Sequence, residues 1–237
     1  MNRITLHCIS LALALSAAIG TVMAADGAPD LSKVNGSLVA EAGRTYGDID
    51  TVNGSITVES KAVARTVETV NGSIVIDAFA TVQDVGTVNG KIVLRNGASA
   101  RNVEIVNGAI VGVSNLRVQK SVEAVNGSIE LGAHSSIGSQ VKTVNGNITV
   151  GDGTVIGGNV TVKKPSNWGM SWGKPKVPRI VLGPNSTVKG NLVFEREVEL
   201  YVHSTAKYGK IVYLEAEAGK AEALKPIVFT GKEPDFK

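Results

Sequence analysis

The tripeptide Val-Asn-Gly recurs along this chain at nearly constant spacing. The step from one copy to the next is the same over the first five copies and one residue longer for the last two. This regularity is typical of a solenoid, in which each repeat forms one coil and buries its apolar residues only against its neighbours. The chain is therefore expected to be a stack of short coils. The copies begin at Val34, Val52, Val70, Val88, Val106, Val125 and Val144.

Apolar residues alternate with polar ones after each tripeptide, as in Ile56-Thr57-Val58. A period of two indicates a β-strand with one buried face. An aliphatic or small residue also recurs at every sixth position from Val52 to Val118, three times in each coil. These patterns predict an all-β, single-stranded parallel β-helix (a β-solenoid) with three faces per coil. We expect a right-handed helix, because parallel crossovers are overwhelmingly right-handed. A left-handed triangular helix of six-residue repeats is the alternative.

The Asn-Gly pairs are expected to form one corner of every coil, because both residues tolerate the left-handed backbone region. Before each corner the inward residues lie three apart, as in Val67 and Val70, which predicts a bulge or bend. Stacked asparagines can form a ladder of amide hydrogen bonds. A structural role is favoured over seven binding sites, since chemistry does not need seven copies of a site. The expected ladder contains Asn35, Asn53, Asn71, Asn89, Asn107, Asn126 and Asn145.

The organisation predicted along the chain has four parts. Residues 1–24 resemble a secretory signal peptide, with Arg3, an apolar run and Val22-Met23-Ala24 before the expected cleavage site. Residues 25–33 form an N-terminal linker or cap. The β-helix spans 34–214 with an inserted loop at 163–179, and 215–237 form a C-terminal cap and tail. This organisation predicts export to the periplasm or cell surface of a bacterium.

Composition bears on stability and on partners. The single cysteine, Cys8, lies in the leader, so no disulfide is expected in the exported chain. Lys and Arg total 24 against 21 Asp and Glu, and the leader holds one of the basic residues and no acid, which leaves a net charge of +2. A near-neutral chain gives no reason to expect nucleic acid as a partner. No second apolar run is long enough to predict a transmembrane segment in the exported chain.

Two families resemble parts of this chain. The glycine-punctuated segment from Ile180 to Leu214 is similar to the bactofilins, a bacterial polymer-forming cytoskeletal family whose coils build a triangular right-handed β-helix. The Val-Asn-Gly-Ser-Ile repeats also resemble bacterial β-strand-repeat proteins grouped as adhesins. These resemblances imply a β-helix with a capacity for self-association and bring no catalytic residues. The signal peptide departs from the bactofilins, which are mostly cytoplasmic.

Few residues suggest catalysis. Without the leader the chain keeps two histidines, His134 and His203, each expected to be a surface residue, and a three-histidine zinc site cannot be assembled. Glu195, Glu197 and Glu199 alternate and are expected to share a solvated face, the alternative being a catalytic carboxylate pair. No nucleophile elbow, phosphate loop or Cys/His cluster occurs. The sequence therefore predicts a protein that is not an enzyme and uses no metal or other cofactor.

The segment from Lys163 to Arg179 differs from everything around it, with three prolines, both tryptophans and no acid. Aromatic rings beside basic groups can stack on sugars and attract anionic polymers. It is therefore a candidate binding loop for envelope polysaccharide, the alternative being that the tryptophans cover an open side of the solenoid. The candidate residues are Trp168, Trp172, Lys174, Lys176 and Arg179.

Three functions follow from these observations. The first is a non-enzymatic structural or scaffold protein of the cell envelope that assembles end to end, because the ends of a solenoid offer unpaired strand edges. The second is a surface adhesin or glycan-binding module that uses the tryptophan loop. The third is a polysaccharide-active enzyme that uses the glutamates at 195, 197 and 199.

Overall fold

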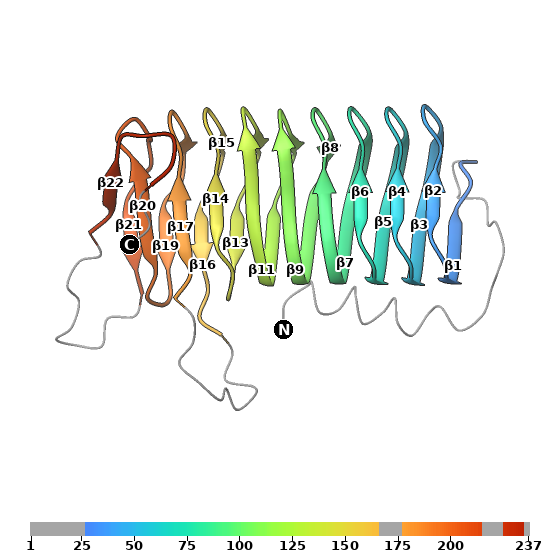
Figure 1. Cartoon of the computed structure of the whole chain (residues 1–237), viewed down its shortest axis with the longest axis horizontal. Coiled ribbons are helices and arrows are strands. Elements are labelled where there is room, and N and C mark those ends of the chain that lie inside the picture. Colours follow the sequence, from blue (N-terminus) through green and yellow to red (C-terminus); the bar gives the residue numbers. More distant parts are fainter. Residues whose placement is uncertain (1–26, 166–176, 215–224, 235–237) are drawn as a thin grey trace.

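The structure, a computed structural model, describes residues 27–165, 177–214 and 225–234. Over these ranges the chain forms strands β1 to β22 and no helix. The strands pair in parallel with strands of neighbouring coils, and the chain makes about nine turns of a solenoid. Figure 1 shows the coils side by side along the long axis, in chain order from β1 to β22. The predicted all-β parallel solenoid is confirmed.

Strand pairing arranges each coil into three faces, here called sheets A, B and C in the order in which the chain crosses them after each Asn-Gly pair. Strands β7 (Thr81–Leu94), β9 (Asn102–Ser114) and β11 (Val122–Ala133) turn corners and contribute to more than one sheet. So do β3 (Thr45–Asn53) and β5 (Val63–Asn71), which run from sheet B into sheet C. The three faces per coil predicted from the six-residue period are therefore present.

The remaining strands each belong to one sheet. Sheet A contains β2 (Leu38–Ala40), β4 (Ile56–Val58), β6 (Ile74–Ile76), β14 (Ile148–Val150), β17 (Arg179–Leu182), β20 (Glu199–His203) and β22 (Ile227–Phe229). Sheet B contains β8 (Ser99–Ala100), β10 (Arg117–Val118), β12 (Ser136–Ile137), β15 (Val155–Ile156) and β18 (Thr187–Val188). Sheet C contains β1 (Leu31–Asn35), β13 (Val141–Thr143), β16 (Val160–Val162), β19 (Leu192–Phe194) and β21 (Ile211–Tyr213).

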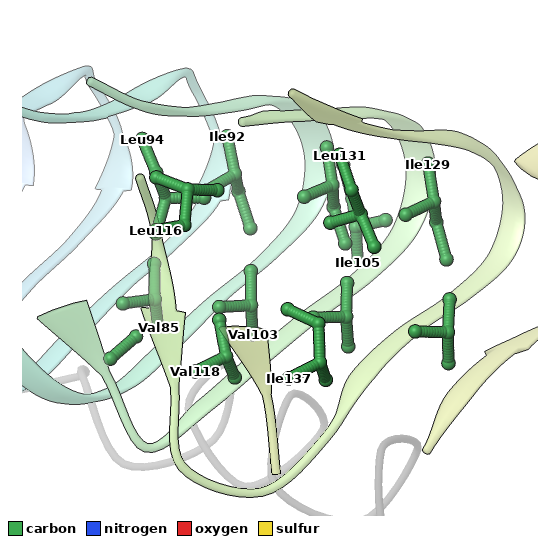
Figure 2. Packing of buried hydrophobic residues seen from close by; sticks show 14 of the residues in the cluster. Val85, Ile92, Leu94, Val103, Ile105, Leu116, Val118, Ile129, Leu131 and Ile137 are labelled. Atoms are coloured by element: carbon green, nitrogen blue, oxygen red, sulfur yellow. The ribbon is translucent and has the colours of Figure 1, made fainter. Parts of the chain in front are cut away.

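The core is a narrow aliphatic column enclosed by the three sheets. Figure 2 shows isoleucine, leucine and valine side chains from successive coils lined up inside it. Large and small side chains trade places between neighbouring core positions from one coil to the next, so that the core stays filled. Leu94 lies beside the small Ala98, but in the next coil Gly112 replaces the leucine and Leu116 replaces the alanine. A Cβ atom on Gly112 would lie 2.1 Å from a methyl carbon of Leu116, so the leucine fills the space that the glycine leaves.

In β5 buried and partly buried residues alternate through sheet C, and the predicted three-residue spacing is wrong. Val67 and Thr69 point inward and are buried, whereas Val70 is only partly buried. An inward threonine is accommodated because its hydroxyl donates to the carbonyl oxygen of Gly54 at 3.0 Å. The polar residue made the strand pattern look broken in the sequence.

The left-handed turn lies at a different corner from the predicted one. Residues with positive φ stack between sheets A and B, and they include the non-glycine residues Lys61, Phe79, Asn115, His134 and Asn185. At the Asn-Gly corner, between sheets C and A, only Gly36 and Gly108 have positive φ. Glycine is needed there because the coils approach too closely for a side chain. A Cβ atom on Gly72 would lie 1.8 Å from the carbonyl oxygen of Gly54.

The solenoid extends beyond the predicted range of 34–214. Strand β1 already pairs with β3, and β22 pairs with β20 inside the expected C-terminal cap. The inserted loop appears as a jump in register: Ile129 pairs with Ile148, but Ile148 pairs with Ile180, a much longer step along the chain. The insertion replaces one Asn-Gly corner, because it connects β16 of sheet C to β17 of sheet A.

Replacing Gly72 by Ala tests the close approach of the coils. A methyl group against the Gly54 carbonyl must push two coils apart, which costs about 1–3 kcal/mol. The thermal midpoint should therefore fall by several degrees. Gly86→Ala is the matched control, because its Cβ would meet nothing closer than 3.8 Å; its free energy of unfolding should stay within about 0.5 kcal/mol. Equal loss in the two variants would contradict the explanation.

Candidate functional site

The seven corner asparagines form one continuous ladder. From Asn53 onward each side-chain amide donates from Nδ2 to the Oδ1 atom of the asparagine in the preceding coil, so these donors point toward the N-terminal end. Six such bonds join Asn35 to Asn145, with N···O distances of 2.8 to 3.0 Å. An amide can occupy every level of such a column because it carries both a donor and an acceptor. The ladder faces solvent along one edge of the solenoid.

Buried threonines form a second column behind this ladder. Thr51 and Thr87 donate to the carbonyl oxygens of Gly36 and Gly72, at 3.3 and 3.2 Å. Ile105 and Ala124 take the place of threonine in β9 and β11, and the pairing of these strands with their neighbours resumes at the Asn-Gly pair and extends into sheet A. In Thr-Val-Asn-Gly the threonine hydroxyl, the asparagine amide and the side-chain-free glycine each make a different contact with a neighbouring coil. The valine is partly buried and makes none of these contacts.

Arg196 ends the ladder on its C-terminal side. The register of β16 with β19 places Arg196 in the same column as the asparagines, two coils beyond Asn145. Its guanidinium Nη1 donates to Oδ1 of Asn145 at 2.7 Å and to the carbonyl oxygen of Val144 at 3.3 Å. The arginine is 7% exposed. The long side chain of Arg196 therefore reaches past the coil that contains the insertion and donates to the side-chain oxygen of Asn145, the last acceptor of the ladder.

The two ends of the insertion are held by carboxylates of the following coil. Lys163, where the insertion begins, forms an ion pair with Glu195, and the Lys164 amide donates to the same carboxylate at 3.3 Å. At the other end Arg179 pairs with Glu199 at 3.1 Å and lies 5.7 Å from the centre of the Tyr201 ring. The insertion is thus anchored at both ends to the outside of the solenoid.

The predicted binding loop lies mostly outside the described residues. Trp168, Trp172, Lys174 and Lys176 belong to that part, and only Arg179 of the predicted set is described. Arg179 contacts Glu199 and Tyr201, and its backbone amide donates to the side-chain oxygen of Asn147 at 3.0 Å. These contacts attach the C-terminal end of the insertion to the solenoid.

The three alternating glutamates do not share one environment. Glu195 and Glu199 hold opposite ends of the insertion, and Glu197 is exposed. Burial acts to raise the pKa of Glu195, but the hydrogen bond and ion pair with Lys163 prevail, so its pKa lies below the usual value. A general acid in glycoside cleavage needs a raised pKa, so the shift at Glu195 is in the opposite direction.

The histidines lie in different settings. His134 is exposed at a corner with a φ of 56°, as predicted. His203, which was predicted at the surface, is only 8% exposed: its ring meets Phe229 edge-on at 5.2 Å, and the Thr205 amide donates to Nδ1 at 3.1 Å. The sequence did not indicate this burial because Phe229 comes from a strand in the expected tail. Within residues 27–165, 177–214 and 225–234, no three acidic, histidine or cysteine side chains are grouped to hold a metal ion.

A further polar column, which was not predicted from the sequence, lies at the corner between sheets B and C. Asp48 and Asp84 pair there with Arg65 and Arg101, one coil farther along. The hydrogen bond from Arg65 lowers the pKa of Asp48. From Asn102 onward, the column carries amides and hydroxyls. In the sequence, this column is visible as a polar residue directly before the first inward aliphatic residue of sheet C in each coil. The column contains Asp30, Asp48, Thr66, Asp84, Asn102, Ser121, Gln140 and Asn159.

Comparison of the chain with protein-family models, with curated proteins and with solved structures gives no match. Across the part of the chain that the structure describes, no helix is long and apolar enough to cross a membrane.

Replacing ladder asparagines by Ala tests the amide column. Asn89→Ala removes two ladder hydrogen bonds, because Asn89 both donates to Asn71 and accepts from Asn107. Asn35→Ala removes only one. At about 0.5–1 kcal/mol for each exposed bond, urea unfolding should show about twice the loss for Asn89→Ala. Equal losses would show that the ladder does not contribute bond by bond.

Arg196→Met tests the end of the ladder. It keeps the apolar stem but leaves the Asn145 and Val144 oxygens without the guanidinium, which costs about 1.5–3 kcal/mol of the free energy of unfolding. A double-mutant cycle with Asn145→Ala should give a coupling energy of about 1 kcal/mol or more. Arg117→Met at an exposed position is the control and should be neutral. A coupling energy near zero would show that the contact between Arg196 and Asn145 does not stabilise the fold.

Proposed function

We propose that this protein is a non-enzymatic scaffold of the bacterial cell envelope, exported by its N-terminal leader, and that copies assemble through the ends of the solenoid. The observation that carries this proposal is the open C-terminal end of the core. Val228 belongs to an inward column of sheet A, because it pairs with the buried Val202. Nevertheless Val228 is 62% exposed.

The strands at this end support the same proposal. Within the described residues β22 pairs only with β20, and β21 pairs only with β19. Both are therefore the last described strands of their sheets, and the outer edges of such strands are templates for pairing with another chain. The exposed apolar residues Leu214 and Ile227 lie beside these edges.

The N-terminal coil offers edges of matching geometry. Among the described strands, β1 pairs only with β3 and β2 only with β4. The two ends share the same order of sheets and the same chain direction. A second copy can thus continue the parallel stack in a head-to-tail contact, which leads to open filaments where the rotation does not close.

The polar side chains favour a scaffold over a catalyst. The corner asparagines are bonded to one another, and Glu195 and Glu199 are bonded to the ends of the insertion. These groups stabilise the stack itself. A rigid rod of repeated coils suits a spacer or framework in the envelope.

Light scattering during gel filtration of the exported chain tests assembly. The mass should exceed that of one chain and should rise with concentration. Val228→Lys places a charge at the open end and should shift the population toward single chains without lowering the thermal midpoint. Val113→Lys is the matched control, because this valine is also half exposed, at 51%, but lies in the middle of the stack. A single chain at every concentration, or the same shift in both variants, would refute the assembly.

A further inference from the structure

A polar groove runs along the corner between sheets B and C in the middle of the solenoid. Its volume is about 720 Å³ and its lining extends from Asn102 to Asn159, over four successive coils. This is the size range of sites that hold small molecules or segments of polymers. The groove lies at a different corner from the asparagine ladder.

The groove occurs where the coils become one residue longer. Ala100 pairs with Val118, whereas Val103 pairs with Val122, so the step between coils grows by one residue from the first pair to the second. The extra residue therefore enters at this corner. The floor is bare backbone, because a Cβ atom on Gly138 would lie 2.0 Å from the Gln119 carbonyl oxygen, and one on Gly157 would lie 2.2 Å from that of Gly138.

One wall of the groove presents side-chain amides and hydroxyls at each level. Asn102, Ser121, Gln140 and Asn159 stack in one column. Their orientations are fixed by local bonds: the Asn102 amide donates to Asp84 at 2.7 Å, and the Ser121 hydroxyl donates to Asn102 at 3.3 Å. These groups therefore present hydrogen-bonding atoms at a spacing of one coil.

The other wall carries balanced charge on sheet C. Glu123 is 7% exposed and is held by an ion pair with Lys142 and by a hydrogen bond from Gln140 at 2.9 Å. With Glu104 and Lys120, the part of the lining that the structure describes contains two acidic and two basic residues. A groove of zero net charge does not favour a polyanion such as nucleic acid.

We propose that this groove binds a neutral linear oligosaccharide. Among the described residues, no aromatic or aliphatic side chain lines the groove, so an apolar ligand has little to pack against. A polyhydroxylated chain can instead exchange hydrogen bonds with the amide, hydroxyl and charged groups at each coil level. The groove follows the axis of the stack, and a chain of repeating units can therefore meet the same groups more than once.

An extended peptide suits the groove less well, because the backbone there is already paired. The amides of Gly138, Gly157 and Gly158 donate to the carbonyl oxygens of Val118, Ile137 and Ser139, at 2.6 to 2.7 Å. No free strand edge remains at the floor for a peptide to join. The inference does not depend on end-to-end assembly.

Calorimetric titration of the exported chain with cellohexaose, maltohexaose and chitohexaose tests the proposal. At least one of these neutral hexasaccharides should bind. Ser139→Leu should weaken its binding at least about tenfold, because Ser139 is exposed in the lining and a leucine would obstruct the groove. Ser136→Leu is the matched control, since this serine is exposed outside the groove on β12, and its affinity should match that of the native chain.

Three results would overturn the proposal. They are no binding of any hexasaccharide at millimolar concentration, equal binding by the native chain and Ser139→Leu, and tighter binding of polygalacturonate than of every neutral probe. Normal thermal midpoints of both leucine variants, measured in parallel, would show that a loss of binding does not come from unfolding. A failure of the oligomer experiment leaves this test unaffected.

Discussion

Every residue in the repeating coils stacks on its counterpart one coil away, and that contact determines which side chains each column can hold. Parallel strands lie about 4.8 Å apart, so a side chain must be compatible with a near-copy of itself. Asparagine meets this condition because one amide donates while the next accepts. Aliphatic residues meet it in the core by packing. Carboxylates repel their own kind, and basic residues of the next coil offset this: Arg65 neutralises Asp48, and Lys142 pairs with Glu123.

A column of side chains that hydrogen-bond to one another leaves one donor or acceptor without a partner where the repeat stops, and another residue must supply that partner. On the C-terminal side of the asparagine ladder the insertion removes a corner, and the acceptor of Asn145 would otherwise be left over. Arg196 supplies the missing donor from two coils away. Lys163 and Arg179 use ion pairs with the next coil for a related purpose, since they hold the two ends of the insertion at the same edge. Charge is thus used where the periodic hydrogen bonding stops, and neutral pairing is used where it continues.

The sequence predicted the repeating part of the structure well, because the strand period and the coil period are both visible in residues such as Ile56 and Val58. The errors came from residues whose role depends on contact with another coil. Thr69 looked polar and therefore outward, but a carbonyl of the previous coil accepts its hydroxyl. The Asn-Gly glycine suggested a left-handed turn, but the neighbouring backbone excludes a Cβ at Gly72. Arg196 gave no local signal, because its partners lie two coils earlier in the stack and far away in sequence.

The contact between equivalent residues of neighbouring coils also distinguishes positions that stabilise the fold from positions that remain available to bind a ligand or partner. Where each coil repeats the last, polar groups are consumed by their counterparts, as in the asparagine ladder. Where the coil becomes one residue longer, at the corner after Val118, a polar groove opens. Where the stack ends, Val228 is the last described residue of an inward column, and it is 62% exposed. In a solenoid, binding is therefore expected at departures from the repeat, since a position that satisfies its own copy has little left to offer a ligand.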